Sequence, residues 1–169
     1  MRRTLVTFLT LLLLWVIVAQ VNHAASAAHL YFFVGGLFVT YAALVLPLRG
    51  GLAAVLLAGA LCDADSPVPF GTHVLLFALA HAVVFNIRDR VPRDETVARV
   101  IVALLVNLAL FLALSFALVG RSPAPASAWP RLLADLVGSQ LLLALVAPWF
   151  LALQARTLVL AGVDRDPLA

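Results

Sequence analysis

Hydrophobic positions form long runs along this chain, separated by short polar stretches. The hydrocarbon core of a bilayer, about 30 Å thick, requires roughly 17–25 helical residues. Apolar runs of about this length cover residues 4–20, 29–48, 71–87, 96–119 and 132–154. One further run, residues 51–62, reaches only about 18 Å at 1.5 Å per residue and is too short to cross as a straight helix. The pattern predicts five full membrane-spanning helices and one short segment.

Composition strengthens this prediction. Hydrophobic residues make up 64% of the chain and charged residues 11%, against roughly 45–50% and about 25% in soluble domains. The chain is therefore an integral membrane protein in the lipid bilayer, with no room for a soluble catalytic or nucleic-acid-binding domain. The single Cys62 provides no disulfide pair. We find no catalytic pattern, metal-ligand spacing or phosphate-binding loop, and expect no enzyme, cofactor, metal site or nucleic-acid partner.

The arginines indicate whether the short segment crosses. If it does, nine arginines share one side and only Arg121 and Arg131 lie on the other. That asymmetry places both termini in the cytoplasm, because positive residues accumulate on the cytoplasmic side. If it does not cross, the four arginines between residues 88 and 99 change sides and the bias largely disappears. The sequence therefore predicts an all-α, six-helix transmembrane bundle, a single domain over residues 1–169, with a short, broken third helix.

The first apolar run also resembles a cleavable signal peptide. It follows Arg2 and Arg3 and precedes the small residues Ala25-Ser26-Ala27. However, it is longer than the usual apolar core of about 7–15 residues, and a retained helix preserves the charge asymmetry. We favour retention, and cleavage stays open as the alternative.

Residues 59–73 interrupt the apolar pattern with polar and helix-breaking groups. Asp63 and Asp65 are costly near a bilayer, Pro67 forces a turn, and Gly71 permits sharp re-entry of the backbone. The carboxylates either bind a cation or proton, or form part of a turn. In the turn, both are expected near the amides of residues 71–74, where one folds back as the anion that a helix start favours. We favour a turn for Asp65; for Asp63 the two roles stay evenly balanced.

Other polar residues lie within the predicted spans. His73 and His81 share a broad face of one helix but lie about 12 Å apart along its axis, which rules out joint ligation of one metal ion. The ordinary role of Asn107, Asp135, Ser139 and Gln140 is hydrogen bonding between helices. Whether His73, His81, Asn107 and Asp135 form one network stays open.

Taken together, these residues resemble the MreD family of bacterial rod-shape-determining membrane proteins. The matching motif is Gly59-x-x-x-Asp63, then Ser66-Pro67, then Gly71-Thr72-His73, and the last span ends in Ala147-Pro148. Extra residues Asp65 and Pro69 depart from the motif, and residues 1–45 carry no match.

The resemblance implies a non-enzymatic scaffold in the bacterial inner membrane that supports cell shape and lateral peptidoglycan synthesis. Its implied partners are a bitopic MreC-like protein and, directly or through it, the MreB filament and the RodA–transpeptidase synthase. It also implies a fold similar to the substrate-binding subunits of energy-coupling-factor transporters. That similarity supplies the alternative function, a small-molecule (vitamin) binding subunit.

Overall fold

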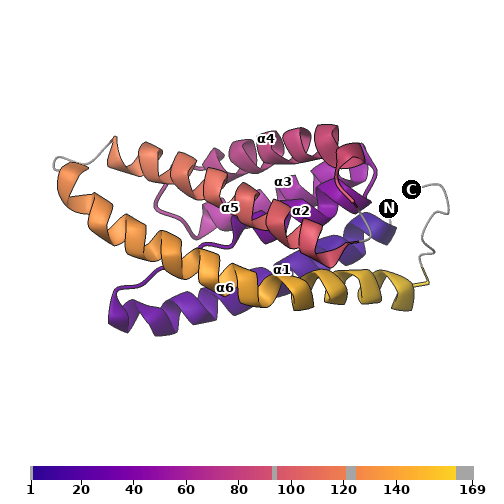
Figure 1. Ribbon diagram of the computed structural model, residues 1–169, viewed down its shortest axis with the longest axis horizontal. Coiled ribbons are helices and arrows are strands. Elements are labelled where there is room, and N and C mark those ends of the chain that lie inside the picture. Colours follow the sequence, from indigo (N-terminus) through magenta and orange to yellow (C-terminus); the bar gives the residue numbers. More distant parts are fainter. Residues whose placement is uncertain (1, 93–94, 121–124, 163–169) are drawn as a thin grey trace.

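The computed structural model describes residues 2–92, 95–120 and 125–162, with the side chains of 125–128 excepted, and these residues form a bundle of six α-helices (Figure 1). Two short 3₁₀ turns, η1 (Ser26–Ala28) and η2 (Arg88–Arg90), follow the first and fourth helices, and no strand occurs in the described ranges. The helices are α1 (Arg2–Ala25), α2 (Gly35–Val45), α3 (Leu48–Ala64), α4 (Thr72–Ile87), α5 (Thr96–Val119) and α6 (Pro125–Leu160). The all-helical, six-helix prediction is confirmed.

Three helical stretches are long and apolar enough to cross a membrane: Arg2–Ala28, Thr96–Val119 and Trp129–Leu160. Their large exposed side chains are mostly apolar and recur every three or four residues, as Leu5, Leu9 and Leu13 do on α1. Apolar faces turned away from the core suit a lipid solvent. The longest helix, α6, contains Pro130 and Pro148 and changes direction part-way along (Figure 1), as expected where proline removes a backbone hydrogen bond.

The centre of the bundle is α2, which is shorter than the sequence predicts. The helix covers only 11 residues of the expected span 29–48, and every residue from Gly35 to Leu44 is buried. The helix packs against α3, α4, α5 and α6. It ends because Leu46, which precedes Pro47, adopts an extended conformation, as residues before proline prefer. Protein, rather than lipid, surrounds this short helix.

The prediction of a short, broken third helix was wrong. Helix α3 has 17 residues and starts directly after Pro47, so the helix includes glycines that resemble a loop in sequence. At Gly51 an added Cβ would lie 2.6 Å from the Ala42 carbonyl oxygen and 2.6 Å from the His81 ring. These glycines are therefore contact points for neighbouring helices, which explains why they sit inside a helix despite their low helix propensity.

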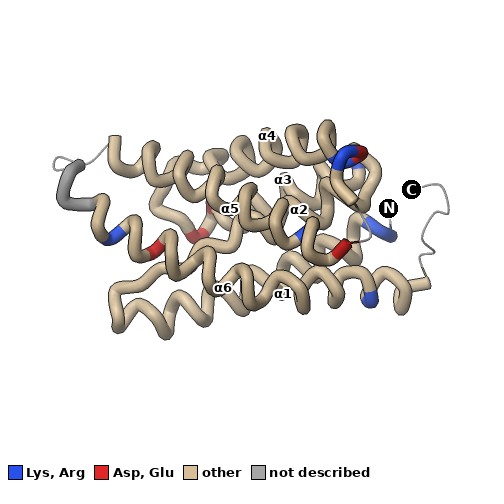
Figure 2. The backbone as a smooth tube through the Cα atoms, in the orientation of Figure 1, with Lys and Arg blue, Asp and Glu red and all other residues tan. Residues whose placement is uncertain are grey.

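The arginines are distributed unevenly between the two ends of the bundle. Successive helices run in opposite directions, and α1 begins at the same end at which α6 finishes (Figure 1). Most described arginines lie toward this end (Figure 2), and they are Arg2, Arg3, Arg49, Arg88, Arg90, Arg99 and Arg156. Arg131, near the start of α6, lies toward the opposite end. Arg93, Arg121 and Arg165, which also entered the charge count, lie outside the described residues.

Candidate functional site

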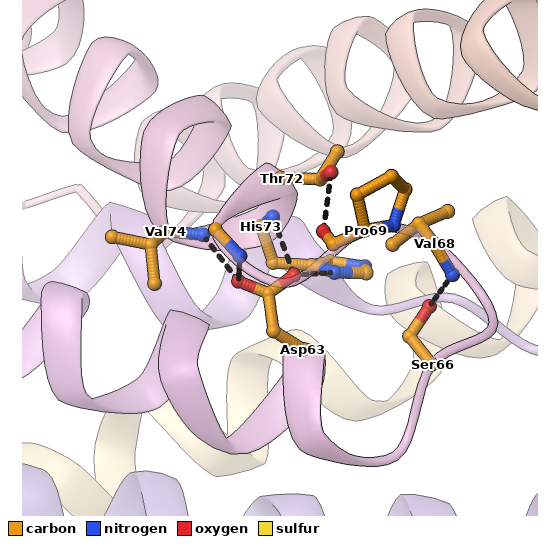
Figure 3. Close-up of polar contacts among 8 residues, drawn as sticks. Asp63, Ser66, Val68, Pro69, Thr72, His73 and Val74 are labelled. Carbon is orange, nitrogen blue, oxygen red and sulfur yellow. Dashed lines mark hydrogen bonds and ion pairs between the residues drawn. The ribbon is translucent and has the colours of Figure 1, made fainter.

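The side chain of Asp63 caps the start of α4. One carboxylate oxygen, Oδ2, accepts hydrogen bonds from the backbone N–H groups of Gly71 (2.9 Å) and Val74 (3.2 Å). The other, Oδ1, accepts from the backbone N–H of His73 (2.8 Å) and lies 2.8 Å from its ring Nδ1 (Figure 3). A carboxylate at this position satisfies amides that have no partner within the helix and complements the helix dipole. The capping role that the sequence allowed for this residue is confirmed.

The local sequence explains how the chain returns to its own carboxylate. Residues 65–71 form the α3–α4 turn, in which the hydroxyl and the N–H of Thr72 both donate to the Pro69 carbonyl (2.7 and 3.1 Å). Gly71 has φ +98°, a left-handed value that glycine adopts without strain. At Gly59, an added Cβ would lie 2.8 Å from Val74 Cα. The absence of a side chain at this position lets α4 pack against α3 at backbone distance, which brings its first amides within reach of Asp63.

The second carboxylate of the break does not share this role. Asp65 is exposed at the C-cap of α3, and its own N–H bonds back to the Cys62 carbonyl (3.3 Å). In the described part of the chain, the amides of Gly71, His73 and Val74 bond to Asp63 and not to Asp65. The expectation that both carboxylates approach these amides was therefore wrong for Asp65, because the helix ends between the two residues and turns Asp65 outward.

The two histidines of α4 have separate surroundings. His73 is 4% exposed, and its ring packs against Phe33 (centroids 6.3 Å apart) and Phe77 (5.8 Å). His81 is fully buried and stacks on Phe85 (6.0 Å). No hydrogen bond links the two histidines within the described ranges.

Four other polar side chains meet at the non-helical segment 30–34, which joins η1 to α2. Asp135 Oδ1 accepts the N–H of Tyr31 (3.0 Å), and Ser139 Oγ accepts that of Phe33 (2.9 Å). Asn107 accepts the N–H of Gly36 and donates to the Phe33 carbonyl, both at 3.1 Å. The Asn22 side chain bonds both the N–H (2.7 Å) and the carbonyl (3.0 Å) of Phe32.

This arrangement corrects the expected role of the polar residues in α5 and α6. Interhelical bonding was predicted, and Gln140 follows it by donating to the Leu104 carbonyl of α5 (3.2 Å). Asn107 also follows it, since it accepts the N–H of Gly36 in α2, and it donates to the Phe33 carbonyl as well. Asp135 and Ser139 instead satisfy backbone groups of segment 30–34. Irregular backbone inside a bilayer is tolerated only where such groups find partners in protein or water. Asn22 was not among the predicted polar residues, although a lone amide near the end of an apolar run was visible in the sequence.

A cavity of about 980 Å³ lies at the end of the bundle opposite the chain termini. The α3–α4 turn stops short of the nearby ends of α1, α5 and α6 (Figure 1), and the cavity is lined by residues from all of these elements and from segment 30–34. Its walls include the aromatic residues Trp15, Tyr31, Phe33, Phe38, Phe77 and Phe111. Such a volume is at the upper end of the roughly 300–1,000 Å³ common for small-molecule sites.

Comparisons with known families, curated proteins and solved structures find no match to this chain. Among the described residues, no group of three or more His, Cys, Asp or Glu side chains is placed to hold a metal ion.

Proposed function

We propose that this protein is a non-enzymatic membrane scaffold of the bacterial cell-elongation complex, similar to the MreD family. The observation that supports the proposal is the capping of α4 by Asp63. The residues that carry the family resemblance, Gly59, Asp63, Gly71 and His73, all contribute to one α3–α4 hairpin. A motif that shapes a hairpin suits a protein whose work is to present a defined surface to partners.

The proposed topology has six crossings, with both termini in the cytoplasm of a bacterial inner membrane. Two features support it: successive helices alternate in direction (Figure 1), and the described arginines concentrate toward the end that holds the termini (Figure 2). Positive residues favour the cytoplasmic side. In this topology, the α3–α4 turn and the cavity face outward, toward the space in which the cell wall is built.

The proposed partner is a bitopic MreC-like protein, through which the scaffold reaches the MreB filament and the RodA–transpeptidase synthase. The lipid-facing surfaces of the bundle are apolar, and the outer face of α4 carries Leu75, Leu79 and Val83 at 55–62% exposure. An apolar face of this kind suits either lipid or the transmembrane helix of a partner.

The test is deletion of the gene in a host without a second copy, followed by complementation. We expect deletion to convert rods to rounded cells, and the tagged wild-type protein to co-purify with the MreC-like partner. Asp63→Ala should fail to complement because the protein does not accumulate, whereas Asp65→Ala should accumulate and restore rod shape. Cells that keep their shape after deletion would refute the scaffold function.

The cavity favours a second candidate, a small-molecule (vitamin) binding subunit of an energy-coupling-factor type transporter. Its aromatic walls and volume suit a compact organic molecule. This candidate predicts co-purification with the ATPase module of a transporter, and unchanged cell shape after deletion. The same deletion strain and the same tagged protein therefore discriminate between the two functions.

A further inference from the structure

The walls of the cavity are mostly apolar, and one of the polar side chains in them, His73, is held in place by Asp63. The ring of His73 lies in the wall between Phe33 and Phe77, and its side chain is only 5% exposed. An imidazole nitrogen in the wall of a cavity favours an occupant that supplies its hydrogen-bond partner, so the surroundings of this ring indicate what the cavity can hold.

Asp63 fixes the orientation and the tautomer of this imidazole. Because the carboxylate already accepts three backbone N–H groups, it is an ionised acceptor, and His73 Nδ1 must donate to it across 2.8 Å. In the neutral imidazole, the other nitrogen, Nε2, then carries a lone pair and acts as a hydrogen-bond acceptor. Among the described residues Nε2 has no partner. Asp63 thus holds Nε2 of His73 in a fixed position in the cavity wall, where it can accept a hydrogen bond.

The charges around the cavity narrow the chemistry of an occupant. The carboxylates of Asp65 and Asp135 line it, with Arg131 as the single arginine among its lining residues. Two negative charges against one positive charge disfavour an anion. An anionic head group also lacks the hydrogen atom that Nε2 requires, whereas a hydroxyl or a protonated amine supplies one.

We propose that this cavity binds a small amphipathic molecule whose apolar body lies among the aromatic side chains and whose hydroxyl or amine group donates a hydrogen bond to Nε2 of His73. This inference does not rest on the scaffold function, because a scaffold and a transporter subunit can each hold such a ligand. The molecule is either a membrane lipid with a donor-bearing head group or a water-soluble amphiphile.

The experiment uses the full chain in phosphatidylcholine nanodiscs, since this lipid has no hydrogen-bond donor of its own. Trp15 lines the cavity, and its fluorescence reports binding once Trp129 and Trp149 are replaced by phenylalanine. The probes share one apolar body and differ in head group: phenylbutanol, phenylbutylamine, phenylbutyrate and butylbenzene. Protein-free nanodiscs give the correction for partition into lipid.

We expect phenylbutanol and phenylbutylamine to bind about threefold to tenfold more tightly than butylbenzene, which is the effect of one hydrogen bond. Phenylbutyrate should bind most weakly. The variant His73→Phe keeps a ring between Phe33 and Phe77 and leaves the amide of residue 73 bonded to Asp63. It should bind all four probes without head-group preference.

A pair of size variants tests the cavity independently of the histidine. Ala19 lines the cavity, so Ala19→Phe should weaken every probe at least tenfold by filling part of the space. Leu79→Phe, on the lipid-facing surface of α4, is the matched control and should bind as the wild type does. Equal affinity for butylbenzene and phenylbutanol, a preference that survives His73→Phe, or equal binding by the two size variants would each overturn the proposal.

A change of lipid separates the two sources of ligand. Phosphatidylethanolamine carries an amine donor, so adding it to the nanodiscs should lower the apparent affinity of phenylbutanol if the occupant is a lipid. Unchanged affinity would instead assign the cavity to water-soluble amphiphiles. Neither result depends on cell shape, so the scaffold function and the cavity proposal can fail separately.

Discussion

Replacing Asp63 by alanine should unfold the start of α4 and destabilise the whole bundle. The substitution strands four donors: the amides of Gly71, His73 and Val74, and Nδ1 of His73. Both groups of His73 are buried, while the other two amides are only partly so. A buried donor without a partner costs about 1–3 kcal/mol. The two donors of His73 therefore give about 2–6 kcal/mol, and we expect a loss of about 3–5 kcal/mol.

The measurement is reversible unfolding of the purified protein in mixed micelles, followed by circular dichroism as the fraction of a denaturing detergent rises. Asp63→Asn is the intermediate variant. Its amide oxygen keeps one hydrogen-bond acceptor, but its NH₂ group faces other donors. Its stability should therefore lie between that of the wild type and that of Asp63→Ala. Asp65→Ala is the matched control. It removes an exposed carboxylate two residues away and should change stability by less than about 0.5 kcal/mol. If Asp63→Ala were as stable as Asp65→Ala, the cap would carry no energy and this account of the turn would be wrong.

Three further substitutions test packing and the non-helical segment in the same unfolding assay. Asn107→Leu removes the hydrogen bonds to Gly36 and Phe33 at the start of α2 and should lower the free energy of unfolding by about 2–4 kcal/mol. The control Leu105→Ala, on the lipid-facing side of the same helix, should lower it by less than half as much. Gly59→Ala places a Cβ against the backbone of α4 and should cost about 1–3 kcal/mol; equal stability with Gly138→Ala, where only a movable ring lies at 3.2 Å, would contradict the close helix contact. Gly71→Ala has open space around the new Cβ but φ +98°, so it should lose only about 1–2 kcal/mol from backbone strain.

The hydrophobic pattern predicted the number of helices because lipid exposure requires long apolar runs. It failed for α2, since the apolar residues 30–34 look the same in sequence whether they are helical or not. What makes segment 30–34 non-helical is a set of side chains from α1, α5 and α6, which lie up to about a hundred residues away along the chain. Local pattern carries no information about such partners.

The candidate site was predictable to the extent that it is local. Asp63 and the amides that it caps are separated by 8 to 11 residues, so turn chemistry and helix-start electrostatics were enough to expect the cap. The cavity was not predictable, because its walls come from every helix end near the turn. The glycines of α3 also led to a wrong prediction of where that helix starts. Gly50 and Gly51 are typical of a loop, but here they lie inside a helix that its neighbours approach closely.

The two interruptions of helical structure explain why a cavity exists in this bundle. Segment 30–34 and the α3–α4 turn both give up the internal hydrogen bonds of a helix, and each recovers them from polar side chains: Asn22, Asn107, Asp135 and Ser139 for the segment, and Asp63 for the turn. The interruptions meet where the ring of Phe33 packs against that of His73. Because α2 begins late and α3 ends early, the longer helices around them enclose space that neither helix fills. Among the polar groups that stabilise the breaks, Asn22 and Asp135 also line the cavity, and Asp63 holds the ring of His73 in its wall, so satisfying the interrupted backbone and shaping the cavity depend in part on the same residues.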